Sequence, residues 1–390
     1  MYQLSKGKSL IRLLFFSTLL WSCNSDKEQK KEVPDEPDTN LEFSVAPAPE
    51  WSAVFKRDSG WFGGDGIFAI PYSGDDTSTA SDSILFLFSD TMFGEIRDGK
   101  LEPGYLMVHN SVGLYKKGQD PSTTEFFLSE DTSGNKTTMF TPDTQDDEYY
   151  WLGDGFVNPA NDNLYIFAYQ IRDTHDGSPF PFEEVGNDLL VFENKNQLPL
   201  DPQRQLNIPH SRKELSGPPI SYGAGVYIEG EKVYIYGVRG PNKELVVART
   251  NAGTIEDFST WEFKAADTWT KDHNIMEVLA EQVSNELSVS KLQNGQYALI
   301  YQGGGINPNI YMQLADSPVG PFGDKQEIWN TSEEVNDPDL FTYNAKAHPA
   351  ISKPGELLIS YNVNSFKFFD IIEDKPNLYR PRFVKIQFNK

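Results

Sequence analysis

The sequence has 390 residues, of which 13% are aromatic, and it contains 30 glycines and 25 prolines. This composition favours many short β-strands joined by turns over long helices. The formal net charge of −23 excludes nucleic acid or an anionic membrane surface as the main partner, because binding to phosphates requires a local excess of Lys and Arg. The single cysteine excludes a disulfide framework.

The N-terminal segment has the pattern of an export signal. Three basic residues precede a short apolar run, and Leu20-Trp21-Ser22-Cys23 follows it. This end of the run resembles the lipobox of bacterial lipoproteins, which implies a signal peptide over residues 1–22 and a lipidated Cys23. The membrane would then be contacted through the lipid anchor only. The alternative is an ordinary signal peptide with an incidental cysteine.

Residues 23–42 are mostly polar and include two prolines, so we expect a disordered tether. Its opening, Ser25-Asp26-Lys27-Glu28, resembles the export signals of some Gram-negative surface lipoproteins. The resemblance implies a bacterial outer-membrane lipoprotein that is exposed at the cell surface.

A pattern of two strands recurs five times between residues 43 and 390. The second strands are expected to start at Ile84, Leu164, Val233, Tyr297 and Leu357. Divergent repeats of this kind predict an all-β fold, a five-bladed β-propeller over residues 43–390, in which residues 380–388 supply a closing strand for the first or last blade. A β-sandwich or two smaller all-β domains is the alternative, although no Pro/Gly/Ser-rich linker divides the body.

Acidic residues recur near the expected starts of the first strands. Asp65 lies in the turn Gly63-Gly64-Asp65-Gly66, and Asp90 ends the next apolar run, so a hairpin would place the two side by side. The first strands of a propeller line its channel, and we expect Asp154, Glu286 and His348 at the matching rim positions.

Two carboxylates on neighbouring strands can hold unlike protonation states, which is what hydrolysis of a glycosidic bond requires. The candidate catalytic residues are Asp65, Asp90, Asp154 and Glu286. In this hypothesis Glu286 could donate a proton from across the channel, and Asp154 could tune the pKa of a neighbour. The alternative for each acid is a turn residue that caps its own backbone.

Polar and aromatic residues near the same rim are candidates for sugar binding. They are Trp61, His109, Asn110, Trp151, Tyr222 and His348. Core packing explains any single aromatic residue equally well, and the histidines could be structural. The absence of a Cys/His cluster argues against zinc, so no metal ligands are assigned. No cofactor is required, although an oxygen-rich rim would suit Ca²⁺.

The first-repeat motifs resemble a family of bacterial five-bladed propellers catalogued as domains of unknown function. They read Gly63-Gly64-Asp65-Gly66, Phe88-Ser89-Asp90-Thr91 and His109-Asn110-Ser111. Related proteins include the endo-D-arabinanases of glycoside hydrolase family 183, and the resemblance implies that the chemistry is carried by Asp65 and Asp90. The chain is more distantly similar to glycoside hydrolase family 43, but the third repeat lacks the acid that this family uses as its proton donor.

These observations predict a surface lipoprotein that is a glycoside hydrolase with a polysaccharide or oligosaccharide as its partner, and the resemblance implies an arabinan-like one. The motif aspartates would carry the cleavage. The alternative is a lipid-anchored glycan-binding protein without catalysis. A third reading is a propeller scaffold for protein partners.

Overall fold

Strands dominate the computed structural model, which describes residues 41–77, 82–144, 147–178, 181–211 and 218–389. The expected signal peptide, Cys23 and all but the end of the expected tether lie outside these residues. Residues Glu42–Lys390 form one unit, to which the following description refers. In the described part of the chain, no helix combines the length and the apolar character needed to cross a membrane.

Five sheets in the described residues follow one plan, in which each strand pairs antiparallel with the next. The first strands are β3 (Phe68–Pro71), β12 (Glu148–Val157), β16 (Ile220–Glu229), β21 (Leu287–Lys291) and β25 (Leu340–Ala347). The second strands are β4 (Ser83–Phe88), β13 (Leu164–Asp173), β17 (Lys232–Arg239), β22 (Tyr297–Gln302) and β26 (Glu356–Ser365). The second strands start within one residue of the expected positions, which confirms that part of the repeat prediction.

Further strands extend each sheet outward. They are β8 (Ser111–Lys116) and β9 (Glu125–Phe127), β14 (Phe182–Phe192) and β15 (Arg204–Asn207), β18 (Glu244–Asn251), β19 (Glu262–Ala265) and β20 (Thr268–Thr270), β23 (Asn309–Ala315) and β24 (Gln326–Asn330), and β27 (Pro381–Phe388) and β1 (Phe43–Pro47).

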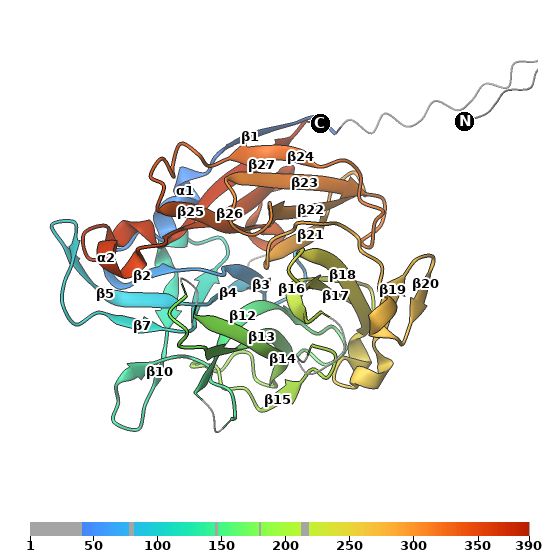
Figure 1. Ribbon diagram of the computed structural model, residues 1–390, viewed down its shortest axis with the longest axis horizontal. Coiled ribbons are helices and arrows are strands. Elements are labelled where there is room, and N and C mark those ends of the chain that lie inside the picture. The colour runs from blue at the N-terminus through green and yellow to red at the C-terminus, as the bar shows by residue number, and fades with distance from the viewer. Residues whose placement is uncertain (1–40, 78–81, 145–146, 179–180, 212–217, 390) are drawn as a thin grey trace, which may run out of the picture. The chain divides into compact units, whose positions relative to one another are not determined.

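The first strands pack successively, β3 beside β12, β12 beside β16, β16 beside β21 and β21 beside β25 (Figure 1). Apolar side chains fill the space between neighbouring sheets, as Phe167 of β13 and Ile235 of β17 do in one buried cluster. The arrangement is an all-β, propeller-like fold.

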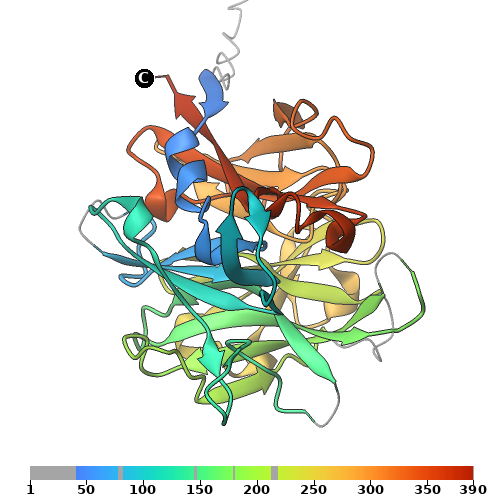
Figure 2. The same cartoon turned by 90° about the vertical axis from the view of Figure 1, so that its left-hand side faces the viewer.

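Both ends of the described unit contribute to the last sheet. Strand β27 pairs with β26 on one side and with β1 on the other. Helix α1 (Pro49–Val54) packs against β27, and Figure 2 shows this blue helix beside the red strand. The closing strand expected at residues 380–388 is therefore confirmed, and it completes the last sheet.

Several elements lie outside the five repeats. Strands β2 (Ser59–Gly64), β5 (Thr91–Arg97), β6 (Lys100–Leu101) and β7 (Leu106–Val108) form an additional sheet, and β10 (Ser129–Glu130) pairs with β11 (Lys136–Thr137). The remaining elements of the described residues are α2 (Phe368–Ile371) and six short 3₁₀ helices, at Pro121–Thr123, Ala252–Thr254, Phe258–Thr260, His273–Ile275, Pro349–Ile351 and Pro376–Leu378. The first strand of the first repeat begins at Phe68. Gly64 ends β2, and Asp65 lies between the two strands.

β-Bulges displace two of the expected rim residues. The register shifts between Leu152 and Gly155 in β12, and between Tyr343 and Lys346 in β25. A bulge interrupts the alternation of side chains between the two faces of a strand. The residues before the bulge therefore do not continue the alternation of the residues after it. As a result Asp154 lies inside β12 and His348 lies after the end of β25, which corrects their placement at the start of a strand.

Candidate active site

The backbone places Asp65 beside Asp90. The N–H of Asp65 donates to the carbonyl oxygen of Asp90 at 3.2 Å, and the N–H of Ser89 donates to the carbonyl oxygen of Asp65 at 2.9 Å. Gly66 follows with φ +63°, and a Cβ there would lie 2.8 Å from Ser89 Oγ and 3.1 Å from Glu286 Oε1. The glycine therefore lets the chain turn and lets Glu286 approach the aspartate pair.

The carboxyl group of Asp65 is held in its protonated form. Burial, and then the charge of Asp90, raise the pKa of Asp65 to about 8, although a hydrogen bond from Tyr343 opposes the shift. Tyr343 Oη donates to Asp65 Oδ2 at 2.6 Å, whereas Asp65 Oδ1 is buried and has no hydrogen-bond partner among the described residues. A carboxyl group with this pKa carries a proton at pH 7 and can donate it.

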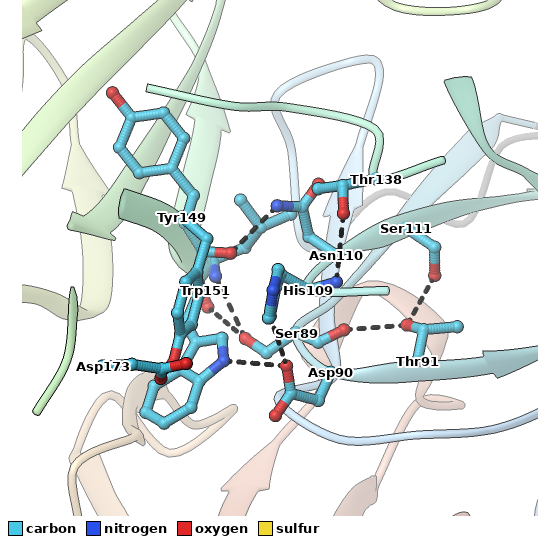
Figure 3. Close-up of polar contacts among 12 residues, drawn as sticks. Ser89, Asp90, Thr91, His109, Asn110, Ser111, Thr138, Tyr149, Trp151 and Asp173 are labelled. Carbon is cyan, nitrogen blue, oxygen red and sulfur yellow. Dashed lines mark hydrogen bonds and ion pairs between the residues drawn. The ribbon is translucent and has the colours of Figure 1, made fainter. Parts of the chain in front are cut away.

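The carboxyl group of Asp90 is partly exposed to solvent. Its Oδ1 accepts a hydrogen bond from Trp151 Nε1 at 3.0 Å and lies 3.3 Å from His109 Nδ1, as Figure 3 shows. The side chain of Asp90 is 19% exposed and that of His109 is 45% exposed, so a solute can reach both. Tyr379 Oη donates to the backbone oxygen of Asp90 at 3.0 Å and so holds the backbone between β4 and β5 in place.

Aromatic rings form a wall beside Asp90. The rings of His109 and Tyr149 stack with centroids 3.7 Å apart, and Tyr149 Oη donates to Asp173 at 3.0 Å. The ring of Phe182 meets Trp151 edge to face with centroids 4.6 Å apart. The sequence predicted two members of this wall, His109 and Trp151, and missed the other two rings.

Asn110 was expected to bind substrate, but the structure shows it supporting the backbone. Its Nδ2 donates to the carbonyl oxygens of Phe140 and Tyr150, both at 2.9 Å, and its Oδ1 accepts from the N–H of Phe140 at 2.8 Å. The residue is fully buried. Asn110 therefore positions the neighbouring His109, which corrects its assignment as a substrate ligand.

Three further predicted sugar ligands are also structural. Trp61 is 1% exposed and stacks on Phe126 with centroids 4.5 Å apart, and Tyr222 is completely buried. His348 is buried as well, its Nε2 lies 2.7 Å from Ser360 Oγ, and burial lowers its pKa well below the usual range. Core packing, which the sequence left open as the alternative, accounts for all three.

Glu286 lies next to Asp65 but is enclosed. Its carboxylate forms an ion pair with Lys346 and accepts from Asn344 Nδ2 at 2.9 Å. Burial raises the pKa of Glu286, and the Lys346 charge opposes that shift. Lys346 is 1% exposed and its ammonium lies 4.4 Å from the centre of the Phe68 ring. Glu286 is therefore placed to influence Asp65 through its charge, and it is not placed to contact a substrate.

Asp154 cross-links two first strands. Its carboxylate accepts from the N–H of Gly155 at 2.8 Å and from that of Val226 in β16 at 2.7 Å. Burial raises its pKa to about 7. Together with Lys346 and His348 it lines a cavity of about 360 Å³ that includes neither Asp65 nor Asp90. The structure therefore does not bring Asp154 into the aspartate pair.

The sequence also missed residues that hold the pair. Tyr343 precedes a bulge in β25 just as Tyr222 does in β16, and this parallel was the one signal that could have revealed it. Tyr379 reaches Asp90 from the segment before the closing strand, and nothing in the local sequence indicates this contact.

Glu184 of β14 is a further buried acid that the sequence analysis did not identify. Burial raises its pKa, and its carboxylate accepts a hydrogen bond from Ser221 Oγ at 2.6 Å.

No metal centre was assigned from sequence, and Ca²⁺ was considered compatible with the rim. Among the residues that the structure describes, no group of three or more His, Cys, Asp or Glu side chains is placed to bind a metal ion.

Fold and site together define an all-β, propeller-like protein with a carboxylate pair next to an aromatic wall. Residues 49–388 match the DUF5005 family, described as a domain of unknown function, and the chain belongs to this family. Among curated proteins, none matches the sequence.

Solved structures with a similar fold include a protein from Bacteroides ovatus ATCC 8483, provisionally described as a hydrolase. It is 20% identical with a TM-score of 0.66, over 92% of this chain and 97% of that one, which shows a shared fold. Glycoside hydrolases are also structural neighbours. An α-L-arabinofuranosidase from Podospora anserina is 11% identical with a TM-score of 0.47, over 90% of this chain and 97% of that one. An exo-β-1,3-galactanase from Phanerochaete chrysosporium is 10% identical with a TM-score of 0.45, over 88% of this chain and 64% of that one. The last two likenesses are too weak to carry an argument about the site.

Proposed function

We propose that the protein is a glycoside hydrolase in which Asp65 donates the proton and Asp90 acts as base or nucleophile. The observation that supports this most directly is the raised pKa of Asp65 beside a second carboxyl group, that of Asp90. Asp65 has a pKa of about 8, and Asp90 lies beside it with Trp151 and His109 at its carboxylate. Such a pair supplies an acid and a base at the same pH.

The proton balance of the reaction follows from these roles. Asp65 transfers its proton to the glycosidic oxygen, the bond from that oxygen to the anomeric carbon breaks, and one sugar leaves as an alcohol. In the direct route, Asp90 accepts a proton from the water that attacks the anomeric carbon. If Asp90 attacks the carbon itself, the ionised Asp65 then removes a proton from the water that hydrolyses the glycosyl–Asp90 ester.

The remaining predicted catalytic residues take supporting roles in this proposal. The Glu286 charge contributes to the raised pKa of Asp65, and Lys346 holds Glu286 in place. Asp154 fixes β12 against β16 and so positions Trp151 on the same strand. Trp151, His109 and Tyr149 present the aromatic surface on which the apolar face of a sugar can pack.

The test is reducing-end release from a panel of polysaccharides by the wild-type protein and by Asp65→Asn and Asp90→Asn. Asp98→Asn is the matched control, since Asp98 is an exposed acid in the turn after β5. We expect activity in the wild type and the control and its loss in both site variants. Retention of activity in the site variants would refute the assignment. Binding without release by the wild type would identify the protein as a non-catalytic glycan-binding protein.

An arabinan-like substrate is proposed from the first-repeat motifs alone. Its support is the resemblance of the segments around Asp65 and Asp90 to the family 183 endo-D-arabinanases. Release of arabinose oligomers from arabinan, without release from the other polysaccharides of the panel, is the expected result.

We also propose that the five repeated sheets are the blades of one propeller and that the chain is anchored in the outer membrane by a lipid on Cys23. The lipobox-like sequence before Cys23 supports the anchor. Metabolic labelling with an alkynyl fatty acid tests it. The wild-type chain should be labelled and Cys23→Ala should not, and protease treatment of intact cells tests surface exposure.

A further inference from the structure

An apolar groove lies between the loop after β22, the loop before β25 and the loop after β26. Ile306 from the loop after β22, Leu340 and Phe341 from the start of β25, and Phe366 after β26 provide its apolar lining. We call it the Phe366 groove. Its volume is about 520 Å³, which falls in the range of about 300–1,000 Å³ that is usual for ligand sites.

The Phe366 groove leaves large apolar side chains in contact with water. Phe366 is 51% exposed and Ile306 is 46% exposed. Clustered exposure of this kind marks a surface that binds something, because water is excluded from it only when a partner covers it. Both side chains belong to loops at one end of their sheets, where the first strand starts and the second strand ends.

Side-chain contacts connect the groove with the aspartate pair. The ring of Phe366 contacts that of Phe341 with centroids 4.7 Å apart, and Phe341 contacts Tyr343 at 5.4 Å. Tyr343 in turn donates its hydroxyl hydrogen to Asp65 Oδ2. Two ring contacts and one hydrogen bond therefore connect the groove with the proposed proton donor. Phe341 and Tyr343 lie two residues apart near the start of β25, so the groove and the hydroxyl group that holds Asp65 lie at the same end of this strand.

The chemistry of the lining selects the occupant. Amide side chains of Asn307 and Asn336 accompany the apolar residues, and Asp337 is the one charged side chain among the described residues of the lining. The whole chain has a formal net charge of −23. Apolar faces with amide groups suit sugar rings and their hydroxyl groups, whereas a lone carboxylate on an acidic protein disfavours an anionic sugar.

We propose that the Phe366 groove binds further sugar residues of a neutral glycan whose cleaved bond lies at Asp65 and Asp90. This inference rests on the proposed glycosidase function and specifies its substrate as an uncharged chain of several residues. It also makes Phe366 a determinant of chain-length preference. Phe366 contacts the glycan away from the reacting bond, so it affects binding and leaves the chemical step unchanged.

The test compares Phe366→Ala with Phe388→Ala. Phe388 is a suitable control because it also packs on a phenylalanine, Phe43, with ring centroids 6.4 Å apart, at the end of β27. Reaction rates are measured on neutral oligosaccharides of increasing length and on a single-residue aryl glycoside. Loss of one aromatic contact should raise KM for the long substrates by about tenfold and leave the aryl glycoside unaffected. The control should match the wild type on both, and both variants should melt at the wild-type temperature.

A binding experiment separates this inference from the proposed function. Affinity electrophoresis is run in gels containing arabinan, arabinogalactan, xylan or polygalacturonate, with Asp65→Asn as the parent protein. A neutral polysaccharide should retard the parent and its Phe388→Ala derivative but not its Phe366→Ala derivative. Equal retardation of the two derivatives, retardation by polygalacturonate, or no retardation at all would overturn the inference. Failure of the wild type to release reducing ends would overturn only the proposed catalysis.

Discussion

Replacing Asp90 by Asn should lower the pKa of Asp65. The substitution keeps the shape of the side chain and removes the charge that is the second cause of the raised pKa of Asp65. Two unit charges at the general spacing of neighbouring strands, about 5 Å, interact by about 3 kcal/mol at an effective dielectric constant of about 20, which corresponds to about 2 pKa units. Burial, the larger cause, stays in place. The pKa of Asp65 should therefore fall from about 8 to about 6.

The assay is a pH titration of the aspartate side-chain carbons by ¹³C NMR, with Asp65→Asn used to assign the Asp65 signal. Asp98→Asn is the control, because Asp98 is exposed at the far end of β5 from the pair. It should leave the Asp65 titration unchanged.

Two results would refute the reasoning. An Asp65 that titrates near 4 in the wild type would show that the site does not hold a proton at pH 7. An Asp65 pKa that is the same in the wild type and in Asp90→Asn would show that the two carboxyl groups do not interact.

Three further predictions follow from the same contacts. Tyr343→Phe removes a hydrogen bond that lowers the pKa of Asp65, so the alkaline limb of the pH–rate profile should move up by about one unit, and a downward shift would contradict the geometry. Because the pKa of Asp65 is higher in the folded protein than its model value of 3.8, the folded state binds more protons between about pH 4 and 8, and stability falls as pH rises through this window. In thermal and urea unfolding, Asp65→Asn should remove a slope of up to about 1.4 kcal/mol per pH unit there, and an unchanged slope would count against the shift. Lys346→Met leaves the buried Glu286 carboxylate without its cationic partner, so the free energy of unfolding measured in urea should fall by about 3–5 kcal/mol. The double variant Lys346→Met with Glu286→Gln should recover part of that loss. An unaffected single variant would show that the pair is not buried.

Local patterns predicted the repeated part of the fold well. The second strands are uninterrupted apolar runs bounded by turns, so their starts could be located within one residue, as at Leu164 and Tyr297. The first strands were located less well because bulges interrupt their alternation. The upstream half of β25, which carries Tyr343, was missed for this reason.

In the candidate site, too, local sequence predicted some residues and could not predict others. Asp65 and Asp90 could be paired from sequence because each follows or precedes a recognisable strand within one hairpin. Trp61, Tyr222 and His348 could not be distinguished from ligands, since an aromatic or histidine side chain next to a turn has the same local sequence whether it faces a channel or the space between two sheets. Burial decides between the two, and burial depends on the neighbouring sheet.

The sequence by itself determined that the chain is built from repeated antiparallel strands and that two aspartates meet at the start of the first repeat. Both are consequences of short-range order: apolar runs, glycine turns and the length of one hairpin. Only the tertiary structure decided that Asp65 keeps its proton and that Glu286 is paired with Lys346. It also decided that ring contacts link an apolar groove to Tyr343, which holds Asp65. These properties arise where segments about 280 residues apart in the chain, such as those of Asp65 and Tyr343, come into contact, and burial and charge at such contacts have no counterpart in the local sequence.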